Sequence, residues 1–267
     1  MPCSRTRPAR RSSPASARAV SFGLTLPDVE LPVRLPLAFV GALTFLLPLP
    51  MPGQATDPTP NALSDAERQA GWRLLFDGRT TRGWRGFRKK QVPPGWTVEE
   101  GALTRVAPAG DLITTKQYRD FELALEWKIA EGGNSGIMYR VTEGSEATYE
   151  TGPEMQVLDD ARHADGRARL TSAGSAYGLY AAPEGIVRPA GEWNQVRIVA
   201  KGRHVEHWLN DVKVVEYELE SRDWEARVAG AKFRQWPAYG RAPKGHIALQ
   251  DHDDRVWFRS IRIREIR

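Results

Sequence analysis

The feature that most constrains the fold is a series of short apolar runs that begins at Gly71 and continues to the end of the chain. The clearest run is Phe121–Ile129, in which Phe, Leu, Leu, Trp and Ile alternate with mostly polar residues. A period of two residues places the apolar side chains on one face of a β-strand. Glycine, proline and aspartate clusters separate the runs, as is typical of the turns between short strands.

Several further runs have the same strand character, and the sequence shows no alternation of strands with helices. Between two of them, Asn210-Asp211 suits a two-residue hairpin turn because both residue types tolerate a positive φ. The pattern therefore predicts an all-β fold, a two-sheet antiparallel sandwich or jelly roll. The runs are Trp96–Glu99, Gly136–Val141, Glu154–Leu158, Asn194–Ala200, His204–Leu209, Val212–Tyr217, Gly245–Gln250 and Val256–Glu265.

Residues 1–55 have the order of a secretory leader. An arginine-rich stretch precedes the apolar run Leu35–Met51, and the small residues Gly53 and Ala55 follow it. Prolines interrupt the apolar run, which is short for a membrane span, so we expect cleavage near Ala55 and no stable membrane anchor. The expected location is exported, either periplasmic or extracellular.

The net charge of +5 does not indicate a nucleic-acid partner, because most of the charge lies in this leader. Six arginines and only two acidic residues fall within residues 1–55, so four of the five net charges belong to the leader. The one cysteine, Cys3, also lies there. The mature chain therefore has no cysteine nucleophile and no cysteine-bound zinc.

Residues 56–70 are expected to form a linker and a short helix. Thr56–Leu63 contains prolines, and Ser64 with Glu67 has the spacing of a helix capping box. We predict a helix over Asp65–Ala70, followed by a single sandwich domain over residues 71–267.

Two motifs carry candidate site residues. In the first, a glycine-rich turn at Gly132 precedes a strand that contains Asn134, Tyr139 and Arg140. Glycines allow a close approach of backbone and ligand, while an arginine and a tyrosine offer hydrogen bonds and a stacking surface to a sugar. An ordinary hairpin turn followed by a strand with an exposed arginine explains the same residues.

The second motif is Gly152–Asp160. Period two places Glu154 and Gln156 on one face of a strand and Met155 and Val157 on the other. A carboxyl group beside an amide suits an acid or base next to a group that orients a hydroxyl. A solvated scaffold face is the equal alternative.

Histidine and glutamine supply further candidates. His207 shares parity with Val205 and Leu209, which indicates a partly buried imidazole, and we keep it as a substrate-binding candidate beside the simpler core interpretation. Gln250 and His252 are two residues apart, so they would lie on the same face where a strand continues into a loop. Such a position is common for binding residues.

Metal binding is only weakly indicated. Asp159 and Asp251 are the candidate ligands, but no spacing typical of a metal site accompanies them. The sequence therefore requires no cofactor, and a divalent metal stays an option.

The chain contains nine tryptophans, which can pack a sandwich core or stack on sugar rings. Trp224 and Trp236 are the better stacking candidates, because both lie in Ser221–Arg241, a strand-poor insertion that we expect to arch over a cleft.

Six blocks in order make the chain similar to the 3-keto-disaccharide hydrolase domain family, over nearly all of residues 71–267. The resemblance implies a concanavalin A-like jelly roll, export in bacteria, and action on a glycoside whose sugar is oxidised at C3. The hairpin has Asn210-Asp211 where such proteins often have Asn-Gly. The blocks are Leu74–Gly78 before Gly83-Trp84, Asn134–Arg140, Gly152–Asp159, Gly191–Asn194, His207–Asn210 and Gly245–His252.

A C3 ketone acidifies the hydrogen on C2, so the C1 substituent can leave by elimination before water adds. This chemistry needs one base, a group that stabilises the enolate oxygen, and an acid for the leaving oxygen. On this basis Glu154 is the expected base, and Arg140 with His252 contacts the enolate or a hydroxyl. Gln156, Asn134 and Tyr139 would orient an oxidised disaccharide or glycoside.

Two other functions fit the same residues. A lectin-like module would bind sugar on this fold without cleaving it. An ordinary glycosidase needs two carboxylates about 5–9 Å apart, which Glu154 with Asp159 or Glu126 could supply.

Overall fold

The computed structural model describes residues 59–266. These residues belong to the second of two units into which the chain divides, Ala55–Arg267. The predicted leader and the first residues of the linker lie outside the described residues. Across residues 59–266, every helix is too short or too polar to span a lipid bilayer.

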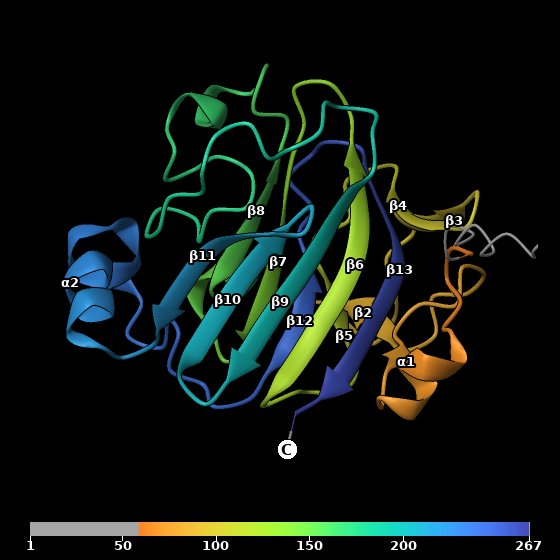
Figure 1. Ribbon diagram of the computed structural model, residues 1–267, viewed down its shortest axis with the longest axis horizontal. Coiled ribbons are helices and arrows are strands. Elements are labelled where there is room, and N and C mark those ends of the chain that lie inside the picture. The colour runs from red at the N-terminus through yellow and green to blue at the C-terminus, as the bar shows by residue number, and fades with distance from the viewer. Residues whose placement is uncertain (1–58, 267) are drawn as a thin grey trace, which may run out of the picture. The chain divides into compact units, whose positions relative to one another are not determined.

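The larger of two antiparallel sheets has eight strands in the order β11-β10-β9-β6-β13-β4-β3, and β1 also pairs with β13. Its centre is the long pair β6 and β13, which lie side by side in Figure 1. The strands are β1 (Arg73–Leu74), β3 (Trp96–Glu99), β4 (Ala102–Arg105), β6 (Phe121–Ile129), β9 (Asn194–Lys201), β10 (His204–Leu209), β11 (Val212–Glu218) and β13 (Val256–Glu265).

The smaller sheet has five strands in the order β2-β5-β12-β7-β8 and lies behind the larger one in the view of Figure 1. Strand β8 ends this order, but the chain after it returns along its free edge. Gln156 donates its backbone N–H to Ser175, and the N–H of Tyr177 donates to the carbonyl of Glu154. The strands are β2 (Trp84–Gly86), β5 (Leu112–Thr114), β7 (Asn134–Val141), β8 (Glu154–Leu158) and β12 (His246–Leu249).

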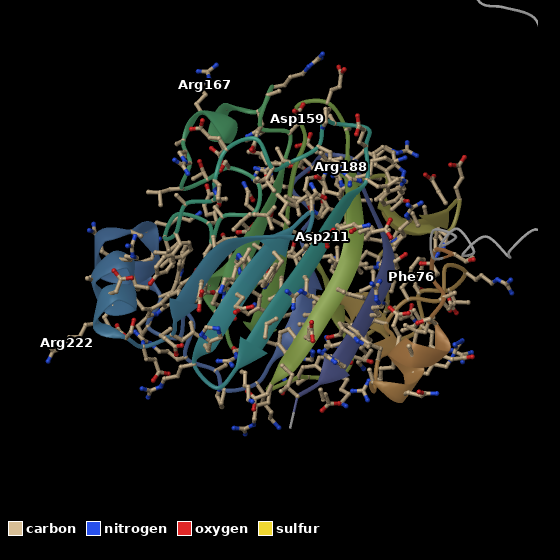
Figure 2. All side chains as sticks on the ribbon, viewed as in Figure 1. Phe76, Asp159, Arg167, Arg188, Asp211 and Arg222 are labelled. Atoms are coloured by element: carbon tan, nitrogen blue, oxygen red, sulfur yellow. The ribbon has the colours of Figure 1, made fainter. Side chains whose placement is uncertain are left out.

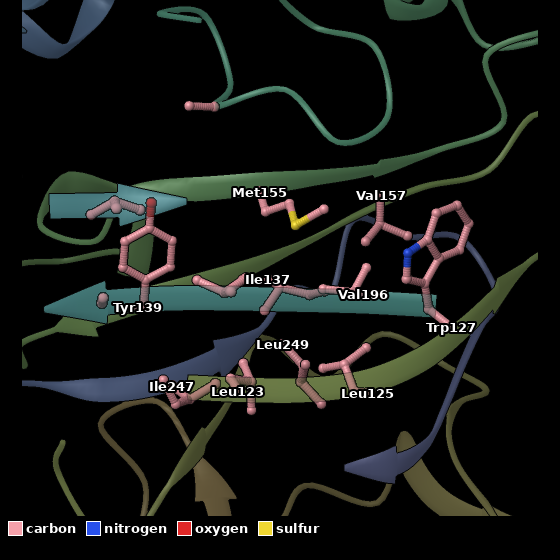
Figure 3. Close-up of a cluster of buried hydrophobic side chains, with 14 of the residues drawn as sticks. Leu123, Leu125, Trp127, Ile137, Tyr139, Met155, Val157, Val196, Ile247 and Leu249 are labelled. Carbon is pink, nitrogen blue, oxygen red and sulfur yellow. The ribbon is translucent and has the colours of Figure 1, made fainter. Parts of the chain in front are cut away.

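The core lies between the two sheets and follows the period-two pattern. Figure 3 shows Leu123, Leu125 and Trp127 of β6 gathered with Met155 and Val157 of β8. Each of these side chains is at most 2% exposed. Burying such a side chain contributes about 1.5–3 kcal/mol, so this alternation fixes which face of each strand points inward.

The predicted two-sheet antiparallel sandwich is confirmed. The hairpin at Asn210-Asp211 is also confirmed, because the φ angles of the two residues are 48° and 65°. Both angles are positive, as a two-residue hairpin turn with the twist of its strands requires.

The helices lie outside the two sheets. Helix α1 (Asp65–Gln69) begins with the predicted capping box, in which Ser64 accepts from the N–H of Glu67 and the Glu67 side chain accepts from the N–H of Ser64. Helix α2 (Arg222–Gly230) lies beside the β11 edge (Figure 1) and begins at the N-cap Ser221. Three short 3-10 helices complete the fold: η1 (Thr148–Glu150), η2 (Ala164–Arg167) and η3 (Lys232–Gln235).

Candidate active site

A small polar pocket of about 110 Å³ opens on the outer face of the smaller sheet. It brings together five of the predicted site residues and three that the sequence did not single out. The predicted ones are Asn134, Glu154, Gln156, Gln250 and His252, and the others are Tyr149, Tyr177 and Lys232.

Strands β7 and β8 build the floor of this pocket. Because β8 alternates, Glu154 and Gln156 leave the core face together and lie opposite Met138 and Gly136 of β7. A Cβ added to Gly136 would lie 1.9 Å from a carboxyl oxygen of Glu154. The missing side chain of Gly136 therefore makes the space in which the carboxyl group folds over the neighbouring strand.

Glu154 is the chemically unusual residue of the pocket. Its side chain is only 7% exposed, and burial raises its pKa to about 8. Lys232 opposes this shift, while the negative charges of Asp111 and Asp165 add to it. A carboxyl group with a pKa near neutrality can both take and return a proton in one reaction cycle.

Gln156 lies beside it with its hydrogen-bonding capacity unused. The residue is 1% exposed, and within residues 59–266 neither its amide nitrogen nor its amide oxygen has a partner. The side-chain oxygen of Gln250, which also lines the pocket, is unpaired in the same way. An unpaired buried polar atom costs about 1–3 kcal/mol, so these amides are arranged for a polar ligand and not for stability.

Lys232 reaches the pocket from the insertion Ser221–Arg241, so this segment approaches the pocket. Its ammonium group lies 4.5 Å from the centroid of the Tyr177 ring, in cation–π contact. The next residue, Phe233, is buried and stacks on Tyr239 with ring centroids 4.1 Å apart. Aromatic packing thus holds the cation at the rim of a pocket that contains a carboxyl group.

Tyr177 and His252 flank the opening. The Tyr177 hydroxyl donates to Asp165 at 3.2 Å, and burial with this negative neighbour raises its pKa to about 12, so it stays protonated. His252 is exposed on the loop after β12, and its ring centroid lies 6.4 Å from that of His163. Both side chains can donate or accept hydrogen bonds.

Arg140 does not reach this pocket, although its place in the glycine-rich motif led us to expect a contact with substrate. Its φ is +56°, and a bulge in β7 places two residues opposite one residue of β12. The bulge reverses the alternation, so the guanidinium group turns away and donates to the carbonyl of Gly202 at 2.5 Å. The enolate contact proposed for Arg140 has no support from this geometry.

Tyr139 and His207 also lie away from the pocket, in the core between the sheets. Both are 0% exposed, and the Tyr139 hydroxyl is 2.9 Å from Nε2 of His207. Burial lowers the pKa of His207 to about 4, so the imidazole is neutral. Neither side chain reaches solvent or lines the pocket, and the core interpretation of His207 is the one that the structure supports.

The two tryptophans of the insertion have different positions. Trp224 is 0% exposed in a stack with Tyr217 and Tyr239, so it offers no platform for a sugar. Trp236 is half-buried, and its ring packs against Tyr149 with centroids 5.3 Å apart. It therefore stands behind a residue that lines the pocket.

The carboxylates of Asp159 and Asp251 are occupied by structural hydrogen bonds. Asp159 accepts from the backbone of Gly132 and Ala161, whereas Asp251 accepts from Arg105 and from three backbone N–H groups. These contacts fix the loops at the end of the sandwich. Among the described residues, the cluster with the spacing of metal ligands is instead His204, Glu206 and Glu216, and the Lys213 ammonium already contacts both of its glutamates.

A larger pocket of about 540 Å³ lies at the loop end of the sandwich and has a different character. Asp159, Arg167 and Arg188 all line it and appear at this end in Figure 2. Other charged groups of its lining pair with each other, such as Arg162 with Glu131. Unlike the small pocket, it has no buried side-chain amide without a partner among residues 59–266.

A family model described as the 3-keto-alpha-glucoside-1,2-lyase-like domain matches residues 71–264. A 3-keto-disaccharide hydrolase from Bacteroides thetaiotaomicron is 36% identical over 226 residues, which cover 73% of this chain and 78% of that protein.

Solved structures agree with this similarity. One from Parabacteroides distasonis, provisionally described as a glycosyl hydrolase, has 34% identity and a TM-score of 0.73, and the match covers 78% of this chain and 100% of that one. A second from the same organism, described in the same way, has 26% identity and a TM-score of 0.58 over 73% of this chain and 99% of that one.

Proposed function

Since this chain belongs to the family of 3-keto-alpha-glucoside-1,2-lyase-like domains, we propose that it cleaves 3-keto-glycosides by removing the proton on C2. Family membership makes it a carbohydrate-active enzyme of the glycoside hydrolase type. We further propose that the C2–H bond breaks before the bond between C1 and the leaving group, that the substrate is oxidised at C3, and that the protein is exported from the cell.

One observation carries the proposed mechanism. Among the described residues that line the pocket, Glu154 is the one carboxylic acid, and it lies near the Lys232 ammonium group. A two-carboxylate glycosidase needs a partner across the cleft. Asp159 is engaged with backbone N–H groups, and Glu126 is paired with Arg259 on the other sheet. A single base beside a cation suits the removal of a proton from a carbon acid.

The proposed reaction proceeds in two steps, an elimination and then the addition of water. Ionised Glu154 takes the proton from C2, and the electrons of that C–H bond form a C2=C3 double bond while the C3 carbonyl becomes an enolate. The enolate then re-forms the C3 carbonyl, its C=C electrons move to form a C1=C2 double bond, and the C1–O bond to the leaving group breaks. The protonated carboxyl group then gives its proton to the leaving oxygen. In the second step, water adds a hydroxyl to C1 and a proton to C2, so the sum is hydrolysis.

The other residues of the pocket hold the substrate for these steps. The enolate oxygen at C3 gains negative charge, and Lys232 supplies the positive charge that Arg140 does not bring to the pocket. Gln156, Gln250 and Asn134 present amide groups to the sugar hydroxyls, and His252 contacts a hydroxyl at the opening.

A carbohydrate-binding module without catalytic activity is the second candidate. The unpaired amides of Gln156 and Gln250 favour it as much as they favour an enzyme, because they require only a polar ligand. The raised pKa of Glu154 distinguishes the two functions, since binding alone gives no role to a carboxyl group poised near neutrality.

The test is to incubate the purified protein with 3-keto-trehalose and with trehalose, each with and without a chelator, and to follow the released glucose. We expect turnover of 3-keto-trehalose only. Turnover of both sugars, or of neither, contradicts the proposal. Saturable sugar binding without product indicates the binding module, and loss of turnover with the chelator indicates a required divalent metal.

A further inference from the structure

The pocket is too small to enclose a whole disaccharide. Its volume is about 110 Å³, whereas pockets that enclose a complete small ligand usually measure about 300–1,000 Å³. The polar floor formed by Glu154, Gln156 and Gln250 suits one sugar ring. The group attached at C1 of that ring must then lie at or beyond the rim.

The rim on one side is aromatic. Tyr149 is 37% exposed, and among the large exposed hydrophobic side chains of residues 59–266 it is the one aromatic residue and the one that lines this pocket. Its ring is supported from behind by Trp236, at 5.3 Å between centroids and 62° between planes. The exposed part of this side chain is accessible to a group that extends beyond the pocket.

The loop that carries Tyr149 is held in place. The Thr148 hydroxyl donates to Asp111, and the backbone N–H of Gly152 donates to the Thr148 carbonyl at 2.9 Å. Lys232 approaches the same ring from the insertion, with its ammonium 5.8 Å from the ring centroid. The position of the ring is therefore fixed by contacts that do not depend on a ligand.

We propose that Tyr149, supported by Trp236, is the subsite for the leaving group of the glycoside. A pyranose presents a face of C–H groups that packs on an aromatic ring, and so does an aryl group, whereas a methyl group is too small to cover it. The residue thus determines specificity: the enzyme prefers a leaving group with a flat apolar face. This inference rests on the proposed function, which places the oxidised ring over Glu154.

The test compares two substrates that share the oxidised ring, 3-keto-trehalose and methyl 3-keto-α-glucoside, for wild type, Tyr149→Ala and Tyr149→Phe. Tyr149→Ala is expected to raise KM for 3-keto-trehalose about tenfold and KM for the methyl glycoside less than twofold, because stacking is lost only for the larger leaving group. Tyr149→Phe keeps the ring and is expected to restore the wild-type KM. Trp208→Ala, on the outer face of the larger sheet, is the control and should alter neither value.

Equal effects of Tyr149→Ala on both substrates, or no effect on either, overturn the subsite. Failure of the proposed function gives a different result, namely no turnover of either substrate by the wild type. In that case, the subsite is tested by binding alone. NMR titration measures the affinities of wild type and Tyr149→Ala for trehalose and for methyl α-glucoside. Unchanged trehalose affinity in the variant would again overturn the subsite.

Discussion

At the scale of single residues, Glu154 shows a conflict between stability and function. Its pKa is about 8 because it is buried, whereas a glutamate in an unfolded chain titrates near about 4.3. Between these pH values the folded state keeps a proton that the unfolded state has released. The free energy of unfolding therefore falls as the pH rises, by up to a value on the order of 5 kcal/mol above pH 8.

Glu154→Gln is expected to remove this loss, because glutamine stays neutral at every pH. Its Tm should be close to that of the wild type at pH 5 and higher by about 5 °C or more at pH 9. Thermal unfolding followed by circular dichroism at both pH values measures the effect. Glu126→Gln, which removes a carboxylate paired outside the pocket, is the matched control. A Tm of Glu154→Gln that stays at or below the wild-type value at pH 9 would speak against a destabilising ionised carboxyl group.

Parity along strands predicted the floor of the site but failed where the backbone departs from regular geometry. Glu154 and Gln156 share a face in β8, a strand without a bulge, and both were found by their period. Arg140 was misplaced because its own φ is +56°, at a bulge that interrupts the alternation of β7. No residue type in the sequence marks that bulge. An arginine is an uncommon residue at positive φ, so the sequence favoured a regular strand.

At the scale of elements, the insertion Ser221–Arg241 completes the site with a cation. Trp224 of α2 stacks on Tyr217 of β11 with ring centroids 5.1 Å apart, and Phe233 stacks on Tyr239 at 4.1 Å. The first stack attaches the insertion to the edge of the larger sheet, and the second packs two residues of the insertion against each other, so Lys232 is positioned by packing. The arrangement assigns the insertion an electrostatic role toward Glu154.

Lys232→Met is expected to move the pH dependence of kcat/KM. Because Lys232 lowers the pKa of Glu154, its removal raises that pKa further, and less of the base is ionised at neutral pH. The rising limb of the profile should shift to higher pH, and kcat/KM at pH 7 should fall about tenfold or more. Lys244→Met, at an exposed position outside the lining of the pocket, is the control. An unshifted limb would show that Lys232 does not act on the base.

Several elements of the fold were not predicted, because their sequence patterns are short or mixed. All four residues of β4 (Ala102–Arg105) are buried, so the strand lacks the alternation that identified β6. Helix α2 buries only Trp224 and Val228, four residues apart, which is a weak apolar stripe. Its N-cap Ser221 and the acidic residues of its first turn were the available signals.

At the scale of the whole molecule, the two sheets use their outer faces differently. On the larger sheet, cations cover two half-buried tryptophans: Arg197 lies 4.0 Å from the Trp208 ring centroid and Arg259 lies 4.0 Å from that of Trp193. On the smaller sheet, Glu154 and the unpaired amides form a pocket. Composition alone did not separate these roles, because only the sheet order places the tryptophans on one outer face and the acid on the other.

The central claim is that Glu154 removes the proton on C2 of a 3-keto-glycoside. The most direct measurement is the deuterium content at C2 of the 3-keto-glucose released from 3-keto-trehalose in D₂O, at early times and corrected for exchange without enzyme. We expect deuterium at C2 in the product of the wild type and no release above background with Glu154→Gln. Release of 3-keto-glucose that retains the original hydrogen at C2, or release at the wild-type rate by Glu154→Gln, would contradict the account.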